Sequence, residues 1–233
     1  MELNVIYEDN HVIVVEKPCN VPSQADSTGD EDMLSLVKQY IKEKYQKPGE
    51  VYLGLVHRLD RPVGGIMVFA RTSKAASRLS EAIRTNQFSK TYLAVVNGSF
   101  DEKKGRLENY LWKDEALNKS MVVSKEKRGA KLASLSYEVL EEKESFSLVK
   151  IHLETGRHHQ IRVQFAHIGH PLYGDQKYGK DNVNQQIALW ACQLEFKHPT
   201  KDEIMNFKCM PKKIGIWEKF RTIRDNHFCA ISL

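Results

Sequence analysis

The sequence predicts an α+β fold in which helices pack on a mixed, largely antiparallel sheet. Short apolar or alternating segments, which are typical of strands, outnumber the segments with helical periodicity. Several of these segments are separated by only a few polar residues, as in hairpins. Internal repeats, low-complexity segments and linker-like composition are absent from the sequence. A single domain over residues 1–233 is therefore the simplest interpretation.

The expected elements follow one another in short steps along the chain. Apolar runs and alternating patterns predict strands over 3–7, 12–15, 51–56, 66–70, 88–96, 132–141, 146–153, 187–196 and 203–209. Apolar side chains at helical spacing predict helices over 33–46, 73–85, 155–169 and 216–223. Ser73 is the expected N-cap of the second helix, and Gly169 is the expected C′ glycine of the third. Residues 99–130 are polar with weak strand signals, and we assign no element there.

Composition limits the class of protein without naming a function. The chain has 233 residues, of which 41% are hydrophobic and 28% charged, and a net charge of +5, which is compatible with a polyanionic partner but does not establish one. It contains no apolar run of the roughly 20 residues that a membrane span needs, and its N-terminus lacks a secretion signal. The four cysteines, Cys19, Cys192, Cys209 and Cys229, form no CxxC pair, which favours thiols in a reducing cytoplasm over a structural zinc site.

The most informative stretch is HRLDRPVGG, residues 57–65. Asp60 stands between Arg58 and Arg61, whose positive charges favour the ionised carboxylate. Proline and the glycine pair predict a turn, and the apolar run at 66–70 follows at once. A polar side chain in a turn between strands is a common position for a catalytic group. The alternative, a surface ion pair between Asp60 and an arginine, stays open at this point.

A second informative stretch, residues 155–169, begins with a cluster of cations. Arg157, His158 and His159 are expected in the first helical turn, where positive charge opposes the helix macrodipole. A sequence that accepts this cost is suited to binding an anion such as phosphate. An ion pair between Arg157 and an acidic residue elsewhere is the alternative.

Several common chemistries lack their motifs. His158, His159, His167 and His170 are close in sequence, but they form no HExxH pattern and no cysteine pairs with them, which argues against a metal site. The sequence has no GxGxxG after a strand, no P-loop and no GxSxG. A single carboxylate in an arginine-rich site remains, and such a group can attack or stabilise an anomeric carbon. A glycosidase normally needs a second carboxylate; Asp175 and Glu154 are candidates, but the sequence marks neither.

Four motifs together resemble the RluA-type family of RNA pseudouridine synthases. They occupy Val5–Pro18, His57–Gly65, Lys90–Gly98 and Thr155–Arg162, with the last continuing to Gly174-Asp175. They occur in the family's order and span most of the chain. The resemblance implies a pseudouridine-synthase-like fold and a compact member without the S4-like domain that many relatives carry. It also implies an enzyme without cofactor or metal that acts on ribosomal or transfer RNA, expected here as a cytoplasmic monomer.

The same resemblance implies roles for individual residues. Asp60 matches the catalytic aspartate, Tyr92 the active-site tyrosine, and Arg162 the arginine that pairs with that aspartate. Arg58 matches the arginine that fills the gap left by a flipped-out uridine. Arg157 and the basic run with Lys125, Lys127 and Arg128 would then contact backbone phosphates.

Two departures from the family pattern stand out. Pro62–Gly65 replaces the usual Thr-Ser-Gly-like turn, and His158 replaces Thr or Ser, which affects the expected phosphate contact more than the chemistry. Two other functions stay open: an RNA-binding or RNA-folding protein without activity, and a nucleoside glycosylase that uses Asp60 to release free base.

Overall fold

The computed structural model describes residues 3–179 and 184–225 and divides the chain into two compact units. The first unit comprises Met1–Lys90 and Ala191–Cys209, and the second comprises Thr91–Trp190 and Met210–Leu233. Two strands, β5 (Phe88–Asn97) and β10 (Leu189–Lys197), continue from one unit into the other. The strand pairs within each unit whose register is known are antiparallel, as the sequence predicts.

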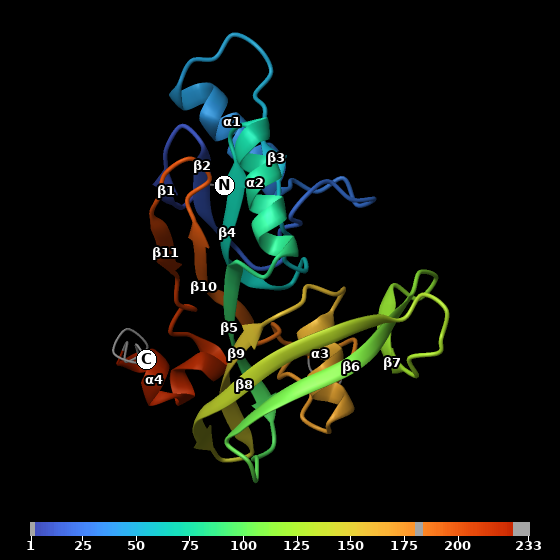
Figure 1. The fold of residues 1–233 in the computed structure, drawn as a ribbon. Helices are drawn as coiled ribbons and strands as arrows, with labels where there is room; N and C mark the ends of the chain where they lie inside the picture. Colours follow the sequence, from blue (N-terminus) through green and yellow to red (C-terminus); the bar gives the residue numbers. More distant parts are fainter. Residues whose placement is uncertain (1–2, 180–183, 226–233) are drawn as a thin grey trace. The chain divides into compact units, whose positions relative to one another are not determined.

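The first unit is a sheet accompanied by two helices. Its strands are β1 (Val5–Glu8), β2 (Val12–Lys17), β3 (Gly54–Leu55), β4 (Gly64–Ala70), most of β10, and β11 (Ile204–Lys208). They have the order β1-β2-β4-β10, with β3 paired to β4 and β11 to β10. The helices are α1 (Met33–Lys44) and α2 (Ser73–Arg84), and α2 runs alongside β4 (Figure 1).

Burial explains why the central strands of this unit read as unbroken apolar runs. Every residue of β4 is buried, and Val12, Ile13, Val14 and Val15 of β2 have no exposed surface. A strand covered on both faces has no polar alternation. The helix start differs from prediction, because Thr72, not Ser73, is the N-cap of α2. Thr72 has extended backbone angles, and its hydroxyl accepts a hydrogen bond from the Ala75 N–H.

The second unit contains the antiparallel order β5-β9-β8-β6-β7. Its further elements are β6 (Lys104–Asp114), β7 (Lys119–Val123), β8 (Lys131–Lys143), β9 (Phe146–Leu153), α3 (Gln160–His167), the 3-10 helix η1 (Gly215–Lys219) and α4 (Arg221–Arg224). Figure 1 shows β6 and β8 as long neighbouring ribbons that lead to β7 and its turns. We call β6, β7 and the turn over residues 124–130 the arm. Helix α3 packs on it through a cluster of Leu111, Ala133 and Val163.

Most predicted elements are confirmed, and the exceptions have local reasons. Residues 99–130 contain β6 and β7, whose charged sequence hides strands stabilised by pairing with β8. The predicted strand at 51–56 is reduced to Gly54–Leu55. The glycine pair at 64–65 belongs to β4 rather than to the turn. Gly65 has φ +125°, and a Cβ there would lie 2.3 Å from the Ala191 carbonyl oxygen, so β10 can approach β4 closely only at a glycine.

Helix α3 is shorter at its start than the sequence predicts. It begins at Gln160, so Arg157, His158 and His159 precede its first turn instead of occupying it. His159 is the N-cap residue and has left-handed backbone angles, with φ 53° and ψ 25°, which a non-glycine residue rarely adopts. At the other end the prediction is confirmed: Gly169 follows the C-cap with φ +86°.

Two expectations concern the chain as a whole. Over residues 3–179 and 184–225, no helix is long and apolar enough to cross a membrane. Within the same ranges, Cys19, Cys192 and Cys209 form no disulfide, and Cys229 lies outside them.

Candidate active site

Asp60 opens a tight turn that is fixed through its main chain. The Val63 N–H donates to the Asp60 carbonyl oxygen at 2.9 Å, closing a four-residue turn. Just before it, the Ser23 hydroxyl forms hydrogen bonds with both main-chain polar groups of Leu59. The Leu59 N–H donates to the Ser23 hydroxyl at 3.1 Å, and that hydroxyl donates to the Leu59 carbonyl at 2.7 Å. The backbone on which the Asp60 side chain stands is therefore well determined.

A buried lysine supports the other side of this turn. The Lys17 ammonium has no exposed surface and donates to the carbonyl oxygens of Arg61 at 3.0 Å and Pro18 at 2.9 Å. Burial lowers the pKa of Lys17 to about 8, against the opposing influence of Cys19 and Asp60. Sequence reasoning missed this residue. Its signals were its place in the Val5–Pro18 motif and its position at the end of an apolar strand, directly before a proline.

His57 is a neutral structural residue. Its Nε2 accepts a hydrogen bond from the Val68 N–H at 3.1 Å, which places the ring proton on Nδ1. Burial, followed by the nearby Lys90, lowers the pKa of His57 to about 3. The ring also contacts Phe88, with centroids 5.7 Å apart. A histidine that stays neutral at ordinary pH and bonds the main chain holds the motif in place without exchanging protons.

The two arginines beside Asp60 differ in their surroundings. Arg61 is turned toward the loop over residues 26–30, where it forms ion pairs with Asp26 and Asp30 and donates to the Thr28 hydroxyl at 3.0 Å. Arg58 is exposed. The observed ion pairs of Arg61 are thus made with carboxylates of that loop.

Tyr92 and Arg162 both lie in the second unit. Tyr92 is in β5, opposite Ile151 of β9, and is 6% exposed. Arg162 is in the first turn of α3 and is also 6% exposed. Its Nε donates to Asp175 Oδ2 and its Nη2 to Asp175 Oδ1, both at 2.8 Å. This is the two-pronged geometry in which arginine binds carboxylate most strongly.

A hydrogen-bonded aromatic cluster surrounds the start of α3. The rings of His158 and His159 stack at 3.7 Å. Tyr178 lies beside them, and its hydroxyl accepts from the Ser120 N–H at 2.8 Å and bonds His159 Nδ1 at 2.9 Å. Burial, and then the charge of Arg162, lower the pKa of His159 to about 2. His159 is therefore neutral, and its Nδ1 and the Tyr178 hydroxyl share a hydrogen bond.

The remaining predicted RNA contacts are exposed. Arg157 donates from Nε to the Leu132 carbonyl at 2.8 Å, so its observed acceptor is main chain and not the acidic residue considered above. Lys125, Lys127 and Arg128 lie in the turn of the arm between β7 and β8. The Lys127 ammonium is 4.8 Å from the centre of the Trp112 ring.

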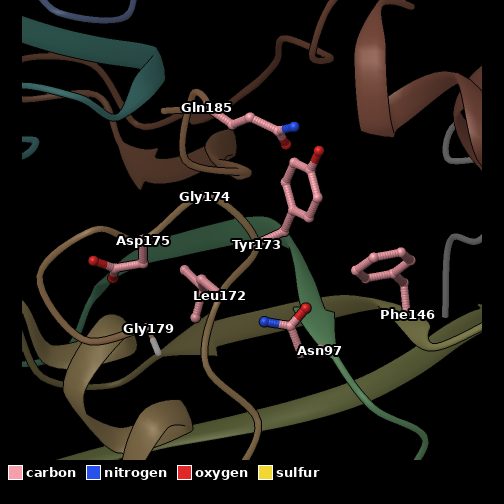
Figure 2. A pocket seen from close by; sticks show the side chains of 8 residues that line it. All are labelled: Asn97, Phe146, Leu172, Tyr173, Gly174, Asp175, Gly179 and Gln185. Carbon is pink, nitrogen blue, oxygen red and sulfur yellow. The ribbon is translucent and has the colours of Figure 1, made fainter. Parts of the chain in front are cut away.

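A cavity of about 230 Å³ lies next to Asp175 in the second unit (Figure 2). It is lined by Asn97, Phe146, Leu172, Tyr173, Gly174, Asp175, Gly179 and Gln185. Figure 2 shows the carboxylate of Asp175 turned away from Tyr173 and Phe146.

The predicted site residues are divided between the units. Asp60 and Arg58 belong to the first unit, and the rest belong to the second: Tyr92, Lys125, Lys127, Arg128, Arg157 and Arg162. The described parts of the chain hold no group of three or more His, Cys, Asp or Glu residues arranged for a metal ion. Of the two carboxylates weighed as a second catalytic group, Asp175 binds Arg162, and Glu154 binds the exposed Arg106.

The fold and the site define an α+β enzyme with a rigidly held aspartate and a buried arginine. The model of the RNA pseudouridylate synthase family matches residues 11–167, and the chain belongs to this family, to its RluA-type members. It is an RNA pseudouridine synthase.

Known relatives agree with this assignment. The chain is 34% identical over 209 residues to the uncharacterized RNA pseudouridine synthase YhcT of Bacillus subtilis, covering 88% of this chain and 67% of that protein. It is 35% identical over 226 residues to ribosomal large subunit pseudouridine synthase D of Neisseria meningitidis serogroup A, covering 89% of this chain and 58% of that one. The structure of human RNA Pseudouridylate Synthase Domain Containing 4 matches with a TM-score of 0.75 and 24% identity over 90% of this chain and 89% of that chain, which shows the fold.

Proposed function

We propose that this RNA pseudouridine synthase isomerises specific uridines in ribosomal or transfer RNA, with Asp60 acting at the N-glycosidic bond of a flipped-out uridine. The observation that carries the proposal is the Asp60 turn. It is held by Ser23 on one side and by the buried Lys17 on the other. A carboxylate on such a backbone is preorganised, which is what a reaction at a fixed sugar carbon requires.

The reaction is balanced without a cofactor. The bond between uracil N1 and the sugar C1′ breaks, the base rotates, and C5 bonds to C1′ while the C5 proton leaves and N1 gains a proton. Asp60 assists the break by attacking or by stabilising positive charge at the sugar. Tyr92 stacks on the base and serves in proton transfer, and Arg162 holds the aspartate ionised.

The target base must leave its stack before it reaches the half-buried carboxylate of Asp60. Arg58, which is exposed and precedes Asp60 by two residues, fills the space that the flipped uridine leaves. Arg157 and the basic turn of the arm contact backbone phosphates, which fixes the position of the RNA without reading its sequence.

Ribosomal RNA is the first candidate substrate. The support is the name of the Neisseria relative, a ribosomal large subunit enzyme with 35% identity. Transfer RNA is the second candidate. Mapping pseudouridines in cellular RNA with and without the gene identifies the position.

Tritium release tests the proposed chemistry directly. RNA labelled at uracil C5 should lose its tritium to water when incubated with the wild type, and Asp60→Asn should abolish this. Glu154→Gln is the matched control, since it removes a carboxylate that pairs with an exposed arginine, and it should keep the wild-type rate. An RNA-binding protein without activity would release no tritium, and a glycosylase would leave abasic sites. Full turnover by Asp60→Asn would exclude the assigned role.

A further inference from the structure

Asp175 is a buried carboxylate that accepts four hydrogen bonds. It lies beyond residues 11–167, the part of the chain that the family model matches. Oδ2 accepts from Arg162 Nε at 2.8 Å, and Oδ1 accepts from Arg162 Nη2 at 2.8 Å. Oδ1 also accepts from the main-chain N–H groups of Lys177 at 3.0 Å and Tyr178 at 3.2 Å. The side chain has no exposed surface. Both oxygens are thus committed to donors inside the protein.

The backbone around Asp175 is wound so tightly that only glycine fits at two positions. Gly174 has φ +71°, and a Cβ there would lie 2.5 Å from the Gln186 carbonyl oxygen. A Cβ on Gly179 would lie 2.5 Å from the Asp175 carbonyl oxygen, to which the Gly179 N–H donates at 2.7 Å. The position of the carboxylate is therefore fixed by the chain itself, independently of the arginine it binds.

This geometry excludes a direct chemical role for Asp175. An acid or base needs an oxygen that can reach the substrate, and both oxygens of Asp175 are buried and occupied. Its effect must pass through the arginine. By binding the edge of the guanidinium formed by Nε and Nη2, it fixes the plane of the Arg162 side chain and the direction of its remaining N–H groups.

The same segment fixes the surroundings of Arg162. The N–H of Tyr178 is held by Asp175, and the Tyr178 ring lies 5.3 Å from the Arg162 guanidinium carbon. The Tyr178 hydroxyl in turn bonds Ser120 of β7 and His159 at the start of α3. One carboxylate thus orders the arginine and the aromatic ring that packs on it.

We propose that Asp175 is a positioning residue that orients Arg162 for catalysis. The inference rests on the proposed function, because it takes Arg162 to act on the catalytic aspartate. Without the carboxylate, the buried guanidinium loses two charge-assisted hydrogen bonds that fix its orientation, so the chemical step should suffer more than RNA binding. A displacement of about 1 Å in such a group costs about 10²-fold in rate.

The test compares Asp175→Asn, Arg162→Met and the double variant under single-turnover conditions. Tritium release and RNA affinity are measured separately, with Glu154→Gln as the matched loss of a carboxylate in the same unit. We expect Asp175→Asn to slow release by about 10²-fold with little change in affinity. The double variant should be no slower than Arg162→Met, because residues that act as one unit are not additive. Additive losses, or an unchanged rate in Asp175→Asn, would overturn the inference.

Two further measurements separate positioning from folding and from failure of the proposed function. Asp175→Glu restores the charge, so its rate should lie above that of Asp175→Asn even where the two melt at the same temperature. Rates that simply follow the melting temperature would contradict positioning. The Arg162 Nε–H signal in NMR should shift and exchange faster in Asp175→Asn, whatever the activity. Absence of tritium release by the wild type overturns the proposed function together with this inference, whereas release by the wild type and undiminished release by Asp175→Asn overturns the inference alone.

Discussion

The two units hold their functional side chains by different means. In the first, the turn of Asp60 is fixed through its main chain, by the Ser23 hydroxyl and the Lys17 ammonium. In the second, Arg162 is fixed through its side chain, by the carboxylate of Asp175. The Asp60 turn is therefore positioned through main-chain atoms, whereas Arg162 is positioned through a carboxylate of its own unit.

The difference shows which substitutions each region tolerates. A side chain on a fixed backbone can be exchanged without disturbing the structure, so Asp60→Asn should fold normally. A side chain held by another side chain depends on that partner, so losing Asp175 disturbs Arg162. Substitutions that each remove one of these contacts test the difference, and the largest effect is expected in the first unit.

The close approach of β10 to β4 is the most sensitive packing contact near the Asp60 turn. In Gly65→Ala, the added Cβ would meet the Ala191 carbonyl oxygen at 2.3 Å and its nitrogen at 2.5 Å. Because both are main-chain atoms, β10 must shift, and we expect a loss of about 4 kcal/mol or more in the free energy of unfolding. Urea denaturation measures it.

The matched control is Gly29→Ala in the same unit. Gly29 also has a positive φ, +73°, but a Cβ there meets nothing within 4 Å. Its cost should be that of left-handed backbone alone, about 1–2 kcal/mol. Equal losses of unfolding free energy in the two variants would show that the contact with Ala191 of β10 contributes nothing to the cost of Gly65→Ala.

The buried Lys17 should make stability depend on alkaline pH. Burial lowers its pKa from 10.5 to about 8, so between these values the unfolded chain holds a proton that the folded protein lacks. The free energy of unfolding therefore rises with pH across this window. The reason is that deprotonation removes the positive charge whose burial destabilises the folded protein. The difference in unfolding free energy between wild type and Lys17→Met should move by about 3 kcal/mol in favour of the wild type from pH 8 to pH 10.5.

Unfolding of both proteins in urea at a series of pH values gives this difference. Lys42→Met, at an exposed lysine of α1, is the control and should show little change, since its charge is hydrated in both states. A difference that falls as the pH rises would mean that Lys17 gains from being charged in the folded protein. The hydrogen bonds from Lys17 to the carbonyl oxygens of Pro18 and Arg61 would then depend mainly on the positive charge of the ammonium.

The contrast between the units also explains what the sequence could predict. The HRLD motif is contiguous, and its turn is closed by a hydrogen bond between Asp60 and Val63, so local patterns identify it. Its supports, Lys17 and Ser23, lie some forty residues away in sequence, and no local rule connects them. The glycine pair was read as part of the turn because the tight contact of Gly65 is with β10, far along the chain.

In the second unit the missed features depend on pairing between distant segments. Strands β6 and β7 carry charges that conceal alternation, and β8 is what completes them. Asp175 was placed at the end of the fourth motif and weighed as a second catalytic carboxylate, but its bond to Arg162 was missed because it arises from the tight segment between the two glycines. Tyr178 was not considered at all, since its contacts join β7 to the start of α3.

The arm offers a smaller test, of binding and not of structure. Replacing Lys125, Lys127 and Arg128 together by Ala should weaken RNA binding and flatten its salt dependence. Each phosphate contact contributes about 0.7–0.9 to the slope of log affinity against log salt, so the slope should fall by about 2 if all three contact the RNA. Filter binding between low and moderate salt measures this.

A matched triple uses cations of the same unit that already pair with glutamates. Lys103, Lys104 and Arg106 bind Glu142, Glu138 and Glu154, respectively. Their replacement by Ala should leave the salt slope close to that of the wild type. A larger change in this triple than in the Lys125, Lys127 and Arg128 triple would place the RNA near the start of β6 instead of at the turn over residues 124–130.

The smallest effect is expected at Arg61, the arginine that follows Asp60 in sequence. Its guanidinium is exposed and bound to Asp26, Thr28 and Asp30, and exposed ion pairs contribute little to stability. Arg61→Gln should therefore leave the melting temperature and the single-turnover rate of tritium release close to those of the wild type. Arg162→Met should instead lose activity with only a modest change in RNA affinity. If Arg61→Gln lost as much activity as Arg162→Met, the aspartate would depend on its sequence neighbour, and the division of tasks between the two units would have to be abandoned.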